Sequence, residues 1–371
     1  MSKNKPARIV VKVGSSTLTD AAGRLDKSAI ADLVRQLAAQ CEKGAQIVLV
    51  TSGAIRAGME RLNMESRPRN MPEKQAAAAV GQGLLLHMYT ELFDRSGITA
   101  AQVLLTRDDF SDRSRYLNAR NTLNTLLSLG AAPIVNENDT VATEEIKFGE
   151  NDTLAAMVAA AIGADLLILL SDVEGLYDMR RGSPKHGQLV PEVKHIGRDI
   201  VAMAGGTDGP AGSGGMRAKI EAAKIAMRSG VTMVIADGRG RDVVADIAAG
   251  RAVGTRFVAD ARSLNSRKRW VAFGAPVRGA LFVNAGARDV LLEGGKSLLA
   301  AGIVDVQGNF KPGDLVAISD ESKMCFGRGF VNYGAAEVRQ IKGRRSGEIE
   351  QILGYKDFDE VIHRDNMVMG V

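Results

Sequence analysis

The sequence has few of the residues that support disulfide, metal or histidine chemistry. Its 371 residues include only two cysteines, Cys41 and Cys325, and four histidines. Two cysteines so far apart suggest neither a disulfide framework nor a zinc site, and this low usage is typical of a reducing compartment. No apolar run approaches the roughly 18 residues of a membrane span, and the charged first residues lack the pattern of a signal peptide. We therefore expect a cytoplasmic protein with no membrane association.

Aromatic residues are also scarce, and charge of one sign does not dominate. Aromatics make up 4% of the chain, so Ala, Leu, Ile, Val and Met must fill the core. Apolar residues at 45% and charged residues at 25% are typical of a globular protein, and the length permits two domains. The formal net charge of +5 suits an anionic substrate, but it is too small to indicate nucleic-acid binding.

Short apolar runs alternate with amphipathic segments over residues 1–262. The expected strands are 8–13, 46–51, 100–105, 132–135, 166–170 and 232–235, and the expected helices are 26–43, 73–93, 113–128, 151–162 and 216–229. In the second of these helices, Gly81 and Gly83 are expected to allow close packing. This alternation predicts a mostly parallel open α/β sheet flanked by helices. Polar turns follow several strands, and the carboxyl ends of parallel strands share one edge of the sheet, where ligands bind.

A glycine-rich stretch, residues 205–219, leads into the last of these helices. Six of its 15 residues are Gly, which let backbone N–H groups crowd around an anion. A helix beginning at Met216 would add its positive end, and Lys219 a full charge. The stretch lacks the Lys-Ser or Lys-Thr pair of a Walker A loop. It predicts a phosphate cradle, although the stretch alone would equally fit a flexible loop with a solvated lysine.

The residues of the polar turns suggest a particular chemistry. Lys12 lies near the end of an otherwise apolar strand, where a buried lysine is costly without a role. No histidine lies in any of these turns, which argues against a histidine base, a histidine-bound metal and a Ser-His-Asp triad. Phosphoryl transfer to a carboxylate needs no base, because a carboxylate with a pKa of about 4 is already ionised. It needs positive charge, from lysines and Mg²⁺, so that two anions can meet.

Several motifs, taken in order and spacing, resemble the glutamate kinases of the amino acid kinase family. They lie at residues 10–16, 50–55, 105–107, 116–120, 135–139, 149–152 and 212–219, and the similarity continues through 267–270 to the end of the chain. The resemblance implies ATP-dependent phosphorylation of the γ-carboxylate of L-glutamate to γ-glutamyl 5-phosphate. This reaction is the first step of proline biosynthesis, and the family implies feedback inhibition by proline.

The same resemblance implies roles for individual residues. Lys12, Lys219 and Asp152 would be catalytic, with Asp152 acting on Mg²⁺ or on site geometry, and no residue is assigned as a direct metal ligand. The glutamate side would comprise Ser52, Asn136, Asp139 and Asn151. The ATP side would comprise Lys12, Ser171, Asp172, Ser213, Gly214, Gly215, Met216, Arg217, Ala218 and Lys219. The implied partners are a second copy of the chain, in a dimer or tetramer, and glutamate-5-semialdehyde dehydrogenase by functional coupling.

The character of the sequence changes after about residue 262. We expect a linker at 263–277, a β domain at 278–356 and a tail at 357–371. Short runs at 279–284, 304–306, 314–319, 327–332 and 337–341, separated by turns, predict a small all-β barrel that resembles a PUA domain. Its basic residues are mixed with acidic ones and its aromatics are sparse, so we do not expect it to bind nucleic acid.

Two alternatives stay open at this point. A relative that phosphorylates aspartate, N-acetylglutamate or carbamate would have the same fold and mechanism with another acceptor. An RNA-binding or regulatory protein could be built on a kinase scaffold that has lost activity. The presence of Lys12, Lys219, Asp139 and Asn151 in one chain argues against that loss.

Overall fold

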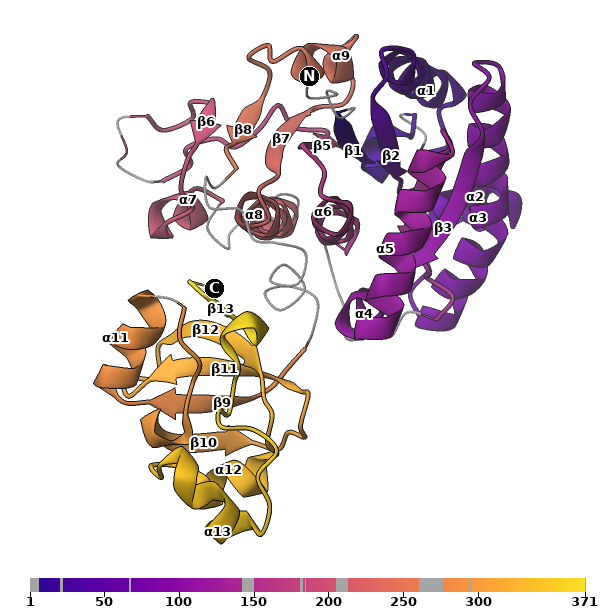
Figure 1. Cartoon of the computed structure of the whole chain (residues 1–371). Coiled ribbons are helices and arrows are strands. Elements are labelled where there is room, and N and C mark those ends of the chain that lie inside the picture. Colours follow the sequence, from indigo (N-terminus) through magenta and orange to yellow (C-terminus); the bar gives the residue numbers. More distant parts are fainter. Residues whose placement is uncertain are drawn as a thin grey trace, which may run out of the picture. The chain divides into compact units, whose positions relative to one another are not determined.

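The chain divides into two compact units (Figure 1). The computed structural model describes residues 7–20, 23–66, 68–141, 150–180, 183, 185–204, 213–259, 276–293 and 295–370. The larger unit lies before residue 264, and the smaller one is built mainly from residues after it. The domain limits expected from the sequence, at 1–262, 263–277, 278–356 and 357–371, stay a prediction.

The larger unit is built on one eight-stranded sheet, in the order β3-β4-β2-β1-β5-β7-β8-β6. The strands are β1 Arg8–Val13, β2 Gln46–Val50, β3 Ala100–Leu105, β4 Ala132–Glu137, β5 Leu166–Ser171, β6 Glu192–Val193, β7 Thr232–Asp237 and β8 Thr255–Phe257. All neighbouring strands from β3 to β7 in this order pair in parallel, whereas β8 is antiparallel to β7. The predicted, mostly parallel open sheet is confirmed, and β1 lies near its middle.

Helices cover both faces of this sheet. They are α1 Lys27–Glu42, α2 Ala54–Arg61, α3 Met71–Asp94, α4 Arg107–Ser111, α5 Arg113–Ser128, α6 Glu150–Ile162, α7 Arg198–Met203, α8 Ser213–Arg228 and α9 Val243–Ala248, with a short 3-10 turn, η1, at Ser15–Thr17. Helix α1 packs on β2 and α9 on β5 and β7, while α6 packs on β1 and α8 on β7. Figure 1 shows α6 and α8 side by side on one face, with α1 and α9 on the other.

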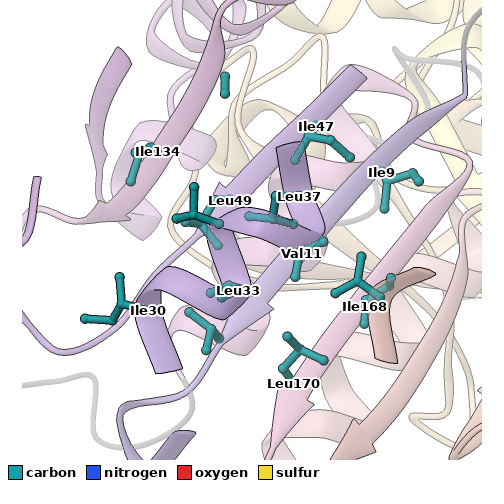
Figure 2. Packing of buried hydrophobic residues seen from close by; sticks show 14 of the residues in the cluster. Ile9, Val11, Ile30, Leu33, Leu37, Ile47, Leu49, Ile134, Ile168 and Leu170 are labelled. Carbon is teal, nitrogen blue, oxygen red and sulfur yellow. The ribbon is translucent and has the colours of Figure 1, made fainter. Parts of the chain in front are cut away.

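The apolar core fixes which way β1 presents its side chains (Figure 2). Ile9 and Val11 of β1 join one buried cluster with residues of α1, among them Leu33 and Leu37. Side chains alternate between the two faces of a strand. Lys12 therefore points to the opposite face, where α6 packs on β1.

Two glycines allow α2 and α3 to pack closely. A Cβ atom on Gly58 would lie 1.7 Å from the carbonyl oxygen of Ala77, and one on Gly81 would lie 1.7 Å from that of Ala54. The expectation of close packing is confirmed for Gly81. It is wrong for Gly83, because no described atom lies within 4 Å of the Cβ position there. The start of α2 is thus seated directly on the middle of α3.

The smaller unit contains a five-stranded sheet in the order β10-β9-β11-β12-β13. Its elements are β9 Val277–Val283, α11 Ala285–Glu293, β10 Ile303–Gly308, β11 Leu315–Asp320, β12 Cys325–Phe330, α12 Ala335–Ile341, α13 Ile349–Leu353 and β13 Met367–Met369. The predicted C-terminal β fold is confirmed, but the strand expected at 337–341 is wrong, because these residues lie in α12. Val338 and Ile341 are both buried and three residues apart, a helical spacing that so short a run does not reveal.

No helix in the described parts of either unit combines the length and the apolar character needed to cross a membrane.

Candidate active site

Two lysines from different elements meet on one buried carboxylate. Lys12 lies near the carboxyl end of β1, Lys219 lies in α8, and Asp152 lies in the first turn of α6. The Nζ atom of Lys12 is 2.6 Å from Oδ1 of Asp152, and the Nζ atom of Lys219 is 3.0 Å from Oδ2. The three residues are only 8%, 9% and 3% exposed, respectively. We call this group the Lys-Asp-Lys triad.

The charges of the triad do not cancel. Two ammonium groups and one carboxylate leave a net charge of +1 in a site that water barely reaches. Burial lowers the pKa of Lys12 below its usual value, against the opposing effect of Asp152, and the charge of Lys219 adds to the lowering. Burial acts to raise the pKa of Asp152, but Lys12 and Lys219 outweigh it, so this pKa lies below its usual range. The first turn of a helix also favours a carboxylate. The site is therefore prepared to attract an anion.

A second set of polar groups links the ends of β2 and β4 to the start of α6. The amide nitrogen Nδ2 of Asn151 lies 3.1 Å from the carbonyl oxygen of Thr51, 3.0 Å from Oγ of Ser52 and 3.1 Å from Oδ1 of Asn136. The same Oδ1 atom accepts the backbone N–H of Glu137. Gly53, which follows Ser52, has a φ of 107°, a conformation that favours glycine. These contacts connect residues that lie 15 to 100 positions apart in the chain.

The orientation of the Asn151 amide follows from its neighbours. The carbonyl oxygen of Thr51 can only accept a hydrogen bond, so the atom facing it must be the nitrogen. The other atom, Oδ1, is buried and has no hydrogen-bond partner among the residues that the structure describes. A buried acceptor without a donor is costly, and such groups usually have an explanation. Oδ1 of Asn151 is thus available to a donor brought by a ligand.

The other side of β1 ends in a separate group of polar residues. The Oγ atom of Ser171, the last residue of β5, donates to Oδ1 of Asp172. Beyond β7, Arg239 donates to the carboxylate of Asp237 and to the backbone carbonyl of Asp172. The first residues of α8 carry Gly215 and Arg217, which are exposed. The ends of β5 and β7 are therefore tied together next to the start of α8.

The structure brings together most of the residues singled out from the sequence. Lys12, Asp152 and Lys219 meet in one group, and Ser52, Asn136 and Asn151 in another. Asp139 lies half-buried in the turn that follows β4. Within α8, Met216 and Ala218 are half-buried, and Ser213 and Gly214 form its first residues.

Two boundaries at the site differ from the sequence-based expectation. Helix α8 begins at Ser213 rather than at Met216, so that its first turn includes Gly214 and Gly215. Strand β4 continues through Asn136 and Glu137, which pair with Leu104 and Leu105 of β3. The rest of the predicted phosphate cradle, residues 205–212, lies outside the described residues.

Sequence reasoning missed several residues that support the site. Tyr89 and Gln82, both in α3, bond to the ends of β2 and β4, and Arg239 bonds to the end of β5. Tyr89 and Gln82 are seven residues apart, which places them on one face of the helix. Two polar groups on a buried helix face would have been a usable signal. Arg239 gave none for its contact with the end of β5, because Asp172 lies 67 residues away.

The donors at the site suit a phosphate better than a bare metal ion. Among the described residues, no group of three or more His, Cys, Asp or Glu side chains is placed to hold a metal. The buried carboxylate of the triad is already paired with Lys12 and Lys219. Lysine ammonium groups bind phosphate oxygens, and phosphate oxygens in turn bind Mg²⁺.

Comparison with known proteins agrees with this arrangement. Residues 7–237 match the amino acid kinase family, and residues 279–353 match the PUA domain. The first match covers well over half of the chain. The chain therefore belongs to the amino acid kinase family.

Individual relatives narrow the resemblance. The chain is 51% identical over 362 residues to the glutamate 5-kinase of Caldanaerobacter subterraneus subsp. tengcongensis, covering 98% of this chain and 97% of the relative. It is 50% identical to the glutamate 5-kinase of Azoarcus sp. strain BH72, with the same coverage. The resemblance to glutamate kinases noted in the sequence is thus confirmed over nearly the whole chain. Among solved structures, the carbamate kinase of Giardia lamblia bound to AMP-PNP aligns with a TM-score of 0.48 and 16% identity, covering 69% of this chain and 99% of that one.

Proposed function

We propose that this protein transfers the γ-phosphoryl group of ATP to the γ-carboxylate of L-glutamate. The observation that carries the proposal is the buried Lys-Asp-Lys triad beside the polar ends of β2 and β4. The relatives that cover nearly the whole chain are glutamate 5-kinases. The product would be γ-glutamyl 5-phosphate, and the reaction would open proline biosynthesis in the cytoplasm.

The chemistry needs positive charge rather than a base. A carboxylate oxygen of glutamate attacks the γ-phosphorus, the new P–O bond forms, the bond to the β-phosphate oxygen breaks, and ADP leaves. No proton moves, because the acceptor is ionised near neutral pH. Lys12 and Lys219 would stabilise the negative charge on the transferring group, and Asp152 would hold both ammonium groups in place. The net charge of +1 in the triad matches this task.

The polar group around Asn151 suits the α-amino end of glutamate, opposite the γ-carboxylate. An α-ammonium group brings hydrogen-bond donors, and Oδ1 of Asn151 is a buried acceptor that no described residue supplies with a donor. The carboxylate of Asp139, at the same edge of the sheet, would add a negative charge. Ser52 and Asn136 would fix the Asn151 amide in this orientation. An acceptor whose nitrogen is acylated would lose the ammonium charge and would be disfavoured.

The nucleotide would lie on the β5 and β7 side of β1. Ser171, Asp172 and the residues from Ser213 to Lys219 would contact ATP, with the start of α8 facing its phosphates. Mg²⁺ would enter on the phosphate oxygens of ATP, where it supplies further positive charge. The triad is consistent with this route, because its lysines can bind phosphate oxygens and its one carboxylate is already paired with them.

We extend the proposal to assembly and regulation. The outer face of α3 carries Ala76, Ala79, Val80, Gly83 and Leu84, all exposed, and an exposed apolar helix face of this kind suits contact with a second copy of the chain. A dimer or tetramer would cover it. Proline would act as feedback inhibitor at the glutamate side, and the acyl phosphate would be consumed by glutamate-5-semialdehyde dehydrogenase.

A trapping assay tests the reaction. The protein is incubated with ATP, Mg²⁺ and L-glutamate in the presence of hydroxylamine, which converts an acyl phosphate to a hydroxamate, and ADP release is followed in parallel. Separate reactions contain aspartate, N-acetylglutamate, or bicarbonate with ammonia, and one glutamate reaction contains proline. We expect hydroxamate only with glutamate, and less of it with proline. Turnover with another acceptor alone would overturn the substrate, and no turnover with any acceptor would overturn the proposal.

A further inference from the structure

Helix α3 carries two polar side chains on its buried face, both directed at the ends of strands. Tyr89 is fully buried, and Gln82 is 9% exposed. Neither belongs to the polar group around Asn151 or to the triad. Each bonds instead to a residue whose backbone contacts Asn151 or Asn136, in a region where an apolar side chain would be the usual choice.

Tyr89 is the first member of an ordered chain of hydrogen bonds. Its OH group lies 2.9 Å from Oγ1 of Thr51, and Oγ1 in turn donates to the carbonyl oxygen of Ser52 over 3.0 Å. The single hydroxyl hydrogen of Thr51 is thereby used, so Tyr89 must be the donor. Burial raises the pKa of the Tyr89 phenol, which keeps this donor protonated. The chain fixes the peptide that follows Ser52.

Gln82 supports the neighbouring strand in the same way. Its Nε2 atom donates to the backbone carbonyl of Glu137 over 3.1 Å, in a buried setting. The backbone N–H of Glu137 is already bound by Asn136. Both backbone groups of this residue are thus bound by side chains. The end of β4 is therefore held from α3 on one side and from Asn136 on the other.

We infer that α3 positions the acceptor-binding half of the active site through Tyr89 and Gln82. The inference rests on the proposed function for the identity of the acceptor, but not for the contacts themselves. Tyr89 and Gln82 are positioning residues, since they act through Thr51 and Glu137 and touch neither substrate nor reacting atoms. The direct seating of α2 on α3 at Gly58 and Gly81 adds a third link, because α2 begins just after Ser52.

The test removes the hydroxyl of Tyr89 and keeps its ring. In Tyr89→Phe we expect the KM for glutamate to rise by roughly three- to tenfold, because one buried hydrogen bond is lost. The KM for ATP and kcat should stay within about twofold of wild type. Thr51→Val should reproduce the effect, and Thr51→Ser, which keeps the hydroxyl, should behave as wild type. The double variant Tyr89→Phe/Thr51→Val should add little to either single variant, because both break the same chain.

Tyr333→Phe serves as the matched control. Tyr333 is also buried, and its hydroxyl donates to the carbonyl of Phe358 in the smaller unit. Its loss removes a comparable hydrogen bond away from α3. We expect no change in the KM for glutamate, whatever the change in thermal stability.

Hydrogen–deuterium exchange provides a readout that requires no substrate. Peptides that cover residues 51–57 should exchange faster in Tyr89→Phe than in wild type or in Tyr333→Phe, and peptides from α8 should not. Unchanged exchange at 51–57, or an equal rise in the KM for both substrates, would overturn the inference. If wild type phosphorylated only another acceptor, glutamate would be excluded as the substrate. The role of α3 would still be decided by the exchange rates and by the KM for that acceptor.

Discussion

Replacing Asp152 by Asn tests whether one carboxylate holds the two lysines of the triad. The variant keeps the shape of the side chain and removes its charge, so Lys12 and Lys219 remain as two buried, unpaired cations. At an effective dielectric constant of about 20, each pair at its observed distance of 2.6 or 3.0 Å attracts by roughly 6 kcal/mol. Lost hydration offsets much of this, and breaking a buried ion pair typically costs about 3–5 kcal/mol. We expect Asp152→Asn to lower the free energy of unfolding by that amount near neutral pH.

The pH dependence of this loss provides a sharper check. Asp152 is the main group that raises the pKa of Lys12 against burial, so its removal should lower that pKa further from the ordinary value of 10.5. Between the lowered pKa and the ordinary one, the unfolded chain binds more protons than the folded one, and the free energy of unfolding rises with pH. The destabilisation should therefore shrink as the pH rises from the Lys12 pKa of the variant to that of wild type, because Lys12 loses its proton first in the variant. The alkaline limb of kcat should move to lower pH, because a neutral amine cannot stabilise the transferring group.

Urea unfolding followed by circular dichroism measures the first effect, and a pH–rate profile the second. Asp26→Asn is the matched control, because Asp26 is the N-cap of α1 and Asn caps helices equally well. This control should change stability by less than about 0.5 kcal/mol. Equal destabilisation of Asp152→Asn at neutral and at alkaline pH, with an alkaline limb of kcat that does not move, would refute the assigned role of the carboxylate.

Three further changes probe other parts of the molecule. Lys219→Ala should lower kcat in the hydroxamate assay by roughly 100- to 1,000-fold. Lys224→Ala, farther along α8, should retain wild-type turnover. Near-normal turnover of Lys219→Ala would exclude Lys219 from catalysis. Gly58→Ala should lower the free energy of unfolding by about 1–3 kcal/mol or more through overlap with α3, and Gly347→Ala, in open space, by less than about 0.5 kcal/mol. Similar values for the two would show that α2 can move. Leu84→Glu should reduce the oligomer in sedimentation velocity, and an unchanged oligomer would place the contact elsewhere.

The sequence was sufficient for the parts of the fold that depend on local pattern. Runs such as 8–13 and 100–105 are strands with the predicted limits, because each is mostly apolar and is followed by polar residues. Lys12 could be singled out, because a charged residue in such a run is unusual. The strand expected at 337–341 failed for the same kind of reason, since five residues carry too little periodicity to separate a strand from the helix α12.

The geometry of the site depended on contacts that no local pattern encodes. Asp152 could be selected from the sequence, but its pairing with Lys12 and Lys219 joins residues from three elements. Likewise, Asn136 was expected in a turn but extends β4, because pairing with β3 outweighs the low strand preference of asparagine. The link from Tyr89 to Thr51 spans 38 residues and requires the packing of α3 to be known.

The position of β1 near the middle of the sheet separates two kinds of evolutionary change. Residues assigned to the acceptor lie at the ends of β2 and β4 and at the start of α6, whereas most of those assigned to the nucleotide lie at the end of β5 and at the start of α8. Both sides share one apolar core, but the polar residues at the two sets of strand ends belong to separate strands. A fold of this kind can acquire a new phosphate acceptor while it keeps an unchanged phosphate donor, because Lys12 marks the line between the two halves.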